Sequence, residues 1–410
     1  MSFNPLQERG TPIEKQIRNW SELNTKPFDT RNVHPYTRVR GIFMNGIEVE
    51  AALFMHQFAR HTADMELKKK LAMVRRVEQQ QQKAVNWMIP GDESTLEVTL
   101  GYEQVAVDLT AALAKNEPDP YVKAALDFAL LEDFDHLYRY ANLQELIDGR
   151  SPQEITGKYT EIMPGRPTIA EHRHPFDDVR KHFDSKKAHP LTKLHALAIV
   201  AAEQQTMNYY MNVGNRFKDP IARGLYLEIG QIEEQHVTHY ESLCDPTCSW
   251  FEMQLMHEYA ECYLYYSMMQ QEVDRQAKMI WEEHLNMEIG HLMIACEIYR
   301  QYEKKDPEAL LPKEMPDKLV IFESNVDYVR NLMAKQTDFN AHGTEFLPAD
   351  KFPKDGRYRE YQKMVNAGGV PSEQVIQKYV QKNGQDYRLE IKGPHPVKRL
   401  AARDGKSQAA

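Results

Sequence analysis

Apolar residues recur at intervals of three and four positions over eight long stretches of this chain. The stretches are rich in Ala, Leu, Met, Gln and Glu, which favour the α-helix. Breakers such as Pro90-Gly91, Asp219-Pro220 and Asp245-Pro246 separate them. Since no segment within them has the pattern of a strand, we predict an all-α fold. The predicted helices are residues 39–63, 65–89, 95–115, 119–147, 191–216, 219–243, 249–276 and 278–303.

The last four stretches repeat the first four at a constant offset of 155 residues. Phe28-Asp29 and His34-Pro35 match Phe183-Asp184 and His189-Pro190 at this offset. Proline suits the first turn of a helix, where its missing N–H group is not needed. We therefore expect two tandem four-helix bundles joined by a linker rich in Pro and Gly. The predicted units are residues 28–147 and 183–303, and the linker is 148–182.

A C-terminal extension, residues 304–410, follows the second unit and lies outside the repeat. We expect it to be partly irregular, with one helix from Asp317 to Lys335 and a short one from Ser372 to Lys382. The tail from Lys398 is predicted to be disordered because it has few residues that could be buried in a core.

Composition and charge narrow the range of partners. The net charge is −9 and no run of Lys or Arg occurs, so nucleic acid is not an expected partner. The longest apolar stretch, 194–202, is too short to cross a bilayer, and the first residues lack the features of a signal peptide. The four cysteines form no Cys-x-x-Cys pair. These features predict a cytoplasmic protein without a membrane partner.

Acidic and histidine residues recur at the same offset. In the second unit a lone Glu is followed 30 residues later by Glu-x-x-His, twice. Residues i and i+3 share a helix face, and 30 residues lead round a turn to the same level of an antiparallel neighbour. Two such hairpins would direct six side chains to one centre. These side chains are Glu203, Glu233, His236, Glu258, Glu288 and His291.

Four carboxylates and two imidazoles form the ligand set of carboxylate-bridged di-iron and di-manganese bundles. This combination suits iron or manganese better than calcium or structural zinc. Four ionised carboxylates also balance two divalent cations. We therefore predict two iron ions, with manganese as the alternative. The gap between His236 and Glu258, only 22 residues, favours up-down-up-down winding of the four helices.

The pattern resembles the rubrerythrin branch of the ferritin-like superfamily, in which a Tyr follows the lone Glu. Tyr210 and Tyr265 stand at that position in the two half-motifs. The resemblance implies that the six residues above are iron ligands and that the two tyrosines support them by hydrogen bonds to ligand carboxylates. No rubredoxin module is present in the sequence, so reduction of peroxide would need a separate electron donor.

The first unit has the same spacing of these positions but different residue types at some of them. Gln81 stands in place of His236, and Asp133 in place of Glu288. Gln is a neutral and poor ligand, so the first unit is either a degenerate second metal site or a scaffold. The candidate residues of that site are Glu48, Glu78, Gln81, Glu103, Asp133 and His136.

Three functions follow as hypotheses. The first is an oxidoreductase, either an oxidase or peroxidase or an oxygenase, whose two iron ions activate O2 or hydrogen peroxide. The second is a ferritin-like protein that binds or sequesters iron without substrate turnover. The third is a helical scaffold that has lost activity. These residues do not specify the substrate or the electron donor. A monomer and a homo-oligomer are both compatible with the sequence.

Overall fold

The computed structural model describes residues 3–354 and 356–401. Helices α1–α13 dominate this part of the chain, which agrees with the predicted all-α class. The predicted disorder from Lys398 falls largely on 402–410, outside the described residues, and Lys398–Leu400 form a 3-10 helix. Among the described residues, no helix is apolar over a length sufficient to cross a membrane.

Eight long helices form the framework, and their starts recur at the 155-residue offset. Their N-caps explain why. His34, Asp64, Ser94 and Asp119 cap the first four helices with their side chains, and the same residue types cap the second four. The helices are α2 (Pro35–Arg60), α3 (Met65–Asn86), α4 (Thr95–Asn116), α5 (Pro120–Ile147), α7 (Pro190–Val213), α8 (Pro220–Glu241), α9 (Trp250–Gln271) and α10 (Arg275–Glu303).

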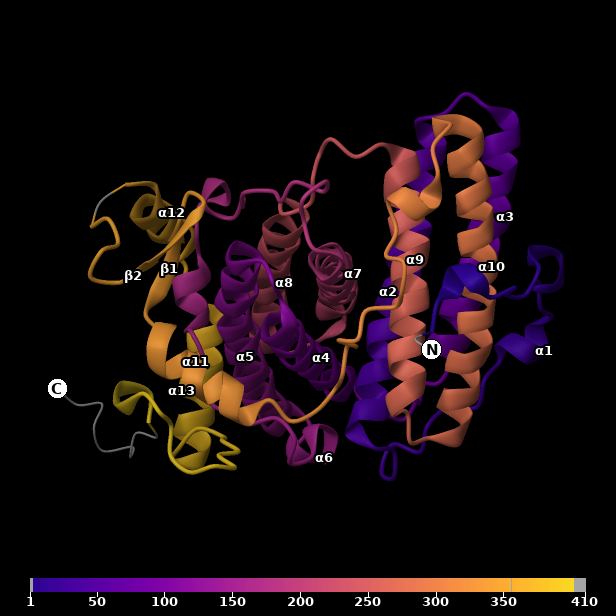
Figure 1. The fold of residues 1–410 in the computed structure, drawn as a ribbon. Coiled ribbons are helices and arrows are strands. Elements are labelled where there is room, and N and C mark those ends of the chain that lie inside the picture. The colour runs from indigo at the N-terminus through magenta and orange to yellow at the C-terminus, as the bar shows by residue number, and fades with distance from the viewer. Residues whose placement is uncertain (1–2, 355, 402–410) are drawn as a thin grey trace.

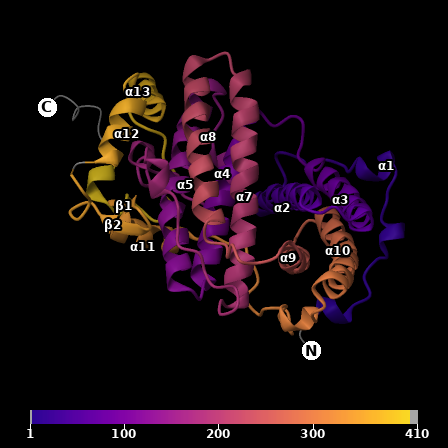
Figure 2. The same ribbon diagram turned by 90° about the horizontal axis from the view of Figure 1, so that it is seen from above.

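These helices assemble as two groups of four, and the grouping differs from the predicted tandem units. Helices α4, α5, α7 and α8 lie together, so residues 95–241 form a contiguous group, here called group B. Helices α2 and α3 lie beside α9 and α10 and form group A, into which group B is inserted (Figures 1 and 2). The predicted bundles 28–147 and 183–303 are therefore wrong in their boundaries, since each group takes one helical hairpin from either half of the repeat.

The predicted up-down-up-down winding of α7 to α10 is wrong for the same reason. The short links after α3 and α8 cross between the groups rather than turning within one of them. Within group B, the long connection from α5 to α7 joins the two hairpins. The groups also run in different directions: in Figure 2, α9 is seen end-on, whereas α7 and α8 lie in the plane of the picture.

Helix α2 joins the two groups, because it packs against α7 and α4 as well as against its own group. Gln205 on α7 donates a hydrogen bond of 2.7 Å to the carbonyl oxygen of Ile42 and accepts one of 2.8 Å from Asn45. Gly46 permits this approach, since a Cβ there would meet the Gln205 side chain at 2.6 Å. This buried contact of Gln205 with α2 fixes the position of the two groups relative to each other.

The C-terminal extension first runs along α9 of group A, where Tyr263 donates a hydrogen bond of 2.6 Å to the carbonyl oxygen of Lys318, and its later helices pack on the outer face of group B (Figure 1). Only the second half of the predicted helix 317–335 is helical, and the predicted helix 372–382 is confirmed as α13. Helix α12 and a small antiparallel β-hairpin were not predicted from the sequence. The elements of the extension are α11 (Val326–Gln336), β1 (Phe339–His342), β2 (Glu345–Pro348), α12 (Arg357–Val365) and α13 (Pro371–Asn383); two short helices precede it, α1 (Trp20–Leu23) and α6 (Gln153–Thr156).

Candidate metal centres

Each four-helix group encloses a buried cluster of carboxylates and imidazoles. The cluster in group B, called cluster B, draws its six members from α4, α5, α7 and α8 in the order lone acid, acid-x-x-His, lone acid, acid-x-x-His. All six are at most 1% exposed. The members are Glu103, Asp133, His136, Glu203, Glu233 and His236.

Cluster B contains two overlapping sets of ligand atoms that share Glu233. Glu103 and His136 form one set with it, and the atoms of each set lie within 4.8 Å of one another. Asp133, Glu203 and His236 form the other set with the same residue. The Nδ1 atom of His136 lies 3.1 Å from Glu233, and that of His236 lies 3.1 Å from Asp133. Two adjacent sets sharing a carboxylate are suited to two adjacent cations.

The outer nitrogens of both histidines in cluster B are held by further carboxylates. Glu171 lies 2.8 Å from Nε2 of His136, and Glu132 lies 3.1 Å from Nε2 of His236. Glu132 is in turn ion-paired with Arg166 and Arg173. A carboxylate that accepts a hydrogen bond from Nε2–H leaves Nδ1 free as a ligand, an arrangement common around metal-bound histidines.

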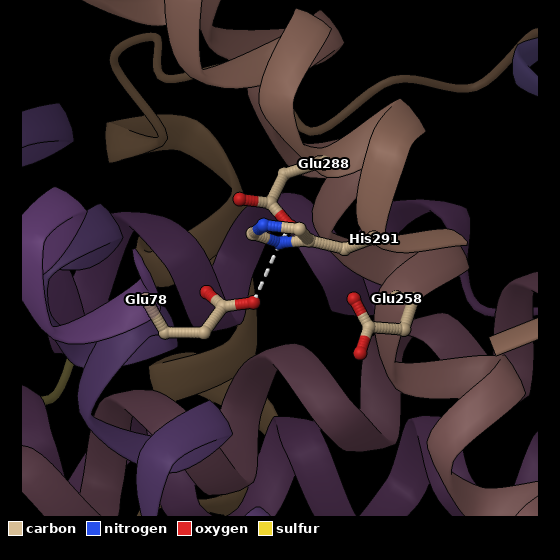
Figure 3. Close-up of side chains that lie close together, drawn as sticks. All are labelled: Glu78, Glu258, Glu288 and His291. Atoms are coloured by element: carbon tan, nitrogen blue, oxygen red, sulfur yellow. Dashed lines mark hydrogen bonds and ion pairs between the residues drawn. The ribbon is translucent and has the colours of Figure 1, made fainter. Parts of the chain in front are cut away.

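Group A holds the second cluster, called cluster A. Figure 3 shows the carboxylates of Glu78, Glu258 and Glu288 turned toward the same space as the ring of His291. These four residues offer ligand atoms within 4.8 Å of one another. The His291 Nδ1 atom lies 2.8 Å from Glu78 and 3.0 Å from Glu288. The full cluster also includes neighbours on α2, α3 and α9, and its members are Glu48, Glu78, Gln81, Glu258, Glu261, Glu288 and His291.

Cluster A is richer in oxygen donors than cluster B. Gln81 occupies the position of a second histidine and donates a hydrogen bond to Glu288. Glu261, three residues after Glu258, adds a fifth carboxylate and is 1% exposed. The backing acid is changed as well, because Met287 stands where cluster B has Glu132 at the 155-residue offset. Cluster A therefore lacks one imidazole and the carboxylate that would orient it.

A tyrosine supports each cluster across the group. Tyr210 on α7 donates a hydrogen bond of 2.5 Å to Glu103 on α4. Tyr265 on α9 donates to Glu48 on α2 and lies 3.0 Å from Nδ1 of His284. Both hydroxyls are buried and fix the carboxylate that they contact.

The electrostatics of both clusters are unfavourable without cations. Burial, followed by repulsion from neighbouring carboxylates, raises the pKa values of Glu48, Glu203 and Glu258 well above their usual range. Burial also pushes the pKa of Glu233 upward, but hydrogen bonds from His136 and His236 outweigh it and lower that pKa to about 2.

Many of the carboxylate oxygens have no hydrogen-bond partner. Among residues 3–354 and 356–401, both oxygens of Asp133, Glu203, Glu258 and Glu261 lack one, as does Nδ1 of His236. Buried polar atoms are rarely left unpaired, because the lost hydration costs about 1–3 kcal/mol or more for each group. Acceptor-only atoms that point at one another fit bound metal ions, so the residues present are compatible with the predicted metals.

The predicted site residues are all buried in such clusters, but the predicted grouping is wrong. Glu203, Glu233 and His236 lie in cluster B, whereas Glu258, Glu288 and His291 lie in cluster A. The proposed degenerate site is divided in the same way. Its residues Glu48, Glu78 and Gln81 belong to cluster A, and its residues Glu103, Asp133 and His136 belong to cluster B. The physical reason is the pairing of hairpins across the two halves of the chain.

Several supporting residues were missed by the sequence analysis. The Oε1 atom of Gln16 lies 2.6 Å from Nε2 of His291 and plays the part that Glu171 plays for His136. These two residues are separated by the same 155 positions, and Gly10-x-Pro12 matches Gly165-x-Pro167 beside them. The repeat therefore extends into the residues before 28 and into the linker 148–182, which were left outside the predicted units, and following it there would have found both residues.

Comparison with protein-family models, with characterised proteins and with solved structures gives no significant match to this chain.

Proposed function

We propose that this protein is a ferritin-like, rubrerythrin-type metal carboxylate protein, and that cluster B is a dinuclear redox centre acting on O2 or hydrogen peroxide. The observation that carries the proposal is the convergence of four buried carboxylates and two imidazole Nδ1 atoms in two sets that share Glu233. Iron or manganese suits this mixture of oxygen and imidazole donors.

Bound metal ions of this kind supply redox chemistry and Lewis acidity. The protein's own residues have three tasks. Glu132 and Glu171 keep the two histidines oriented with Nδ1 toward the centre. Tyr210 holds Glu103 in place. The apolar residues around the six ligands keep water from competing for the carboxylates, since the ligands are at most 1% exposed.

An external electron donor is part of this proposal if peroxide is reduced, because the sequence contains no Cys-x-x-Cys pair of the kind that holds a rubredoxin iron. The alternative function is metal binding without turnover. The composition of cluster A favours metal binding without turnover at that cluster, since Gln81 already donates to Glu288 and the set contains a single imidazole. A protein with one redox centre and one holding site would combine both functions.

Metal analysis followed by oxidant consumption tests the proposal. We expect the chain reconstituted with Fe(II) to bind at least two ions and to consume O2 or hydrogen peroxide, and a Glu233→Gln variant to lose most of that consumption. Metal binding without oxidant consumption would support the sequestering alternative. Absence of bound iron and manganese after reconstitution would contradict both functions.

A further inference from the structure

A cavity lies at the junction of the two helix groups, and no member of cluster A or cluster B lines it. Its volume is about 260 Å³, and its walls come from α2, α7, α8 and α9 together with the segments before α7 and between α8 and α9. Small-molecule pockets typically measure about 300–1,000 Å³, so this cavity suits a ligand smaller than a typical drug. It is formed only because group B is inserted into group A.

Most of the cavity wall is apolar. Phe54, Leu197, Val200, Val237 and Met256 contribute side chains from four different helices. Such walls bind the hydrocarbon body of a ligand through the hydrophobic effect, at roughly 25 cal/mol for each Å² removed from water.

Acidic groups give the cavity a polar end. Glu50 on α2 and Glu241 on α8 both line it, and their mutual repulsion contributes to the raised pKa of Glu241, after burial and the effect of Glu234. Within the part of the chain that the structure describes, neither carboxylate lies within 4.0 Å of a Lys or Arg nitrogen. Lys193 also lines the cavity, but Glu252 and Asp245 lie near it and offset its charge.

His257 is the second polar feature. It is 7% exposed, stacks on Phe54 at 5.2 Å between ring centroids, and its Nε2 atom has no hydrogen-bond partner among the described residues. That atom lies 3.7 Å from Glu50, while Nδ1 lies 3.8 Å from Glu261 of cluster A. An unpartnered, buried ring nitrogen beside an unpaired carboxylate calls for a ligand that donates hydrogen bonds.

We propose that this cavity binds a small organic cation, specifically a primary amine with an alkyl or aryl body. The ammonium group would donate to Glu50, Glu241 and Nε2 of His257, and the body would lie among the apolar walls. A bare metal ion fits less well, because these three residues are not among the described groups whose ligand atoms lie within 4.8 Å of one another. The site is separate from the proposed redox centre and does not depend on it.

Calorimetric titration of the full-length, metal-loaded chain tests this assignment. Hexylamine and phenethylamine are the probes, and hexanol and hexanoate, which lack the cation, are the comparisons. We expect saturable binding of the amines at one site and at least tenfold weaker binding of the comparisons. That factor corresponds to the loss of about one charge-assisted hydrogen bond.

Two variants locate the site. Glu50→Gln combined with Glu241→Gln should weaken amine binding at least tenfold, and Val200→Trp, which fills the cavity, should abolish it. Glu297→Gln, an exposed acid on α10 outside the cavity lining, is the matched control and should change binding less than twofold. Circular dichroism confirms that each variant is folded. Absence of amine binding, equal binding of hexanoate, or unchanged binding in the double Gln variant would overturn the proposal.

Discussion

At the scale of single residues, the side chains that contact the outer ring nitrogens of the histidines organise both clusters. His136, His236 and His291 each turn Nε2 toward an acceptor outside the cluster, namely Glu171, Glu132 and Gln16. Nδ1 is thereby left facing the carboxylates. Two of the acceptors are acids and serve cluster B, whereas Gln16 of cluster A is neutral. Since an acid backing a histidine increases its strength as a ligand, cluster B should hold its metal more tightly.

The division of the ligands predicts that the two clusters lose metal independently. We expect Glu203→Gln to reduce the metal content of cluster B alone and Glu258→Gln that of cluster A alone, each lowering total bound metal by roughly half. The double variant should lose nearly all of it. Elemental analysis of the three reconstituted proteins measures this, and loss of all metal from Glu203→Gln alone would contradict the separation of the clusters.

Asp108 predicts a pH dependence remote from the metal ligands. Burial raises the pKa of this carboxyl to about 7, although Thr160, Asn325 and Tyr36 donate hydrogen bonds that oppose the rise. The folded protein thus binds a proton that the unfolded chain has lost above about pH 4. Stability from this group is therefore highest below pH 4 and falls as pH rises toward 7.

Comparison with Asp108→Asn isolates this effect, since the amide does not titrate. The free energy of unfolding of the wild type, minus that of the variant, should decline between pH 4 and pH 7 by up to about 1.4 kcal/mol for each pH unit. Urea unfolding at several pH values measures the difference. A difference that is constant with pH would show that Asp108 is ionised throughout in the folded protein.

At the scale of elements, glycines set how closely the supporting segments approach the helices. Gly290 lies between the ligands Glu288 and His291 on α10, and a Cβ there would overlap the carbonyl oxygen of Thr11 and come within 2.8 Å of the Gln16 amide. Gly165 approaches the backbone of α5 in the equivalent way, through Leu131 and Asp135. The absence of a side chain at these positions lets the segments that carry Gln16 and Glu171 reach the histidines.

Gly290→Ala should therefore displace the segment that carries Gln16. We expect a loss of about 1–3 kcal/mol in the free energy of unfolding from overpacking, together with weaker metal binding at cluster A. Gly230→Ala on α8 is the matched control. A Cβ there meets its nearest neighbours, Met211 and Tyr210, at 3.5 Å, an ordinary contact distance, so the substitution should be neutral or stabilising. Urea unfolding and metal titration of both variants provide the measurement.

At the scale of the whole molecule, the insertion of group B into group A makes the two halves of the chain interdependent. Residues 95–241 contain every member of cluster B, together with Glu132 and Glu171. Cluster A instead needs α2 and α3 from the beginning and α9 and α10 from the later part of the chain. Cluster B can thus form from one continuous segment of the chain, whereas cluster A needs two segments that are far apart in the sequence.

Fragments distinguish this arrangement from tandem units. A fragment of residues 88–249 should bind two metal ions per chain with the affinity of cluster B, because all its ligands are present. A fragment of residues 183–303, which carries Glu203, Glu233 and His236 with Glu258, Glu288 and His291, should form no such centre as a monomer. Metal titration with circular dichroism as the check on folding compares them. Tight binding of two ions by monomeric 183–303 would contradict the insertion.

The fold and the candidate site were predictable from the sequence to the extent that local interactions decide them. Helix starts follow from caps such as His34 and Ser94, whose side chains bond the first turn of their own helix. The ligands are recognisable because the i, i+3 step of Glu233 and His236 places them on one helix face. These interactions span few residues, so they can be recognised from the sequence alone.

Which hairpins share a metal centre was decided only by the tertiary structure. An offset of 155 residues gives the length of the repeat but does not say where each folded unit begins. The hairpin of α7 and α8 could therefore pair with that of α4 and α5 or with that of α9 and α10. The choice depends on long-range packing, such as that of Tyr210 on Glu103 and of Gln205 on α2. Loops as long as residues 148–189 permit either partner at little entropic cost, because closure entropy grows only slowly with length. The ligands and their helices were therefore determined locally, and their assignment to two centres was determined by the folded chain.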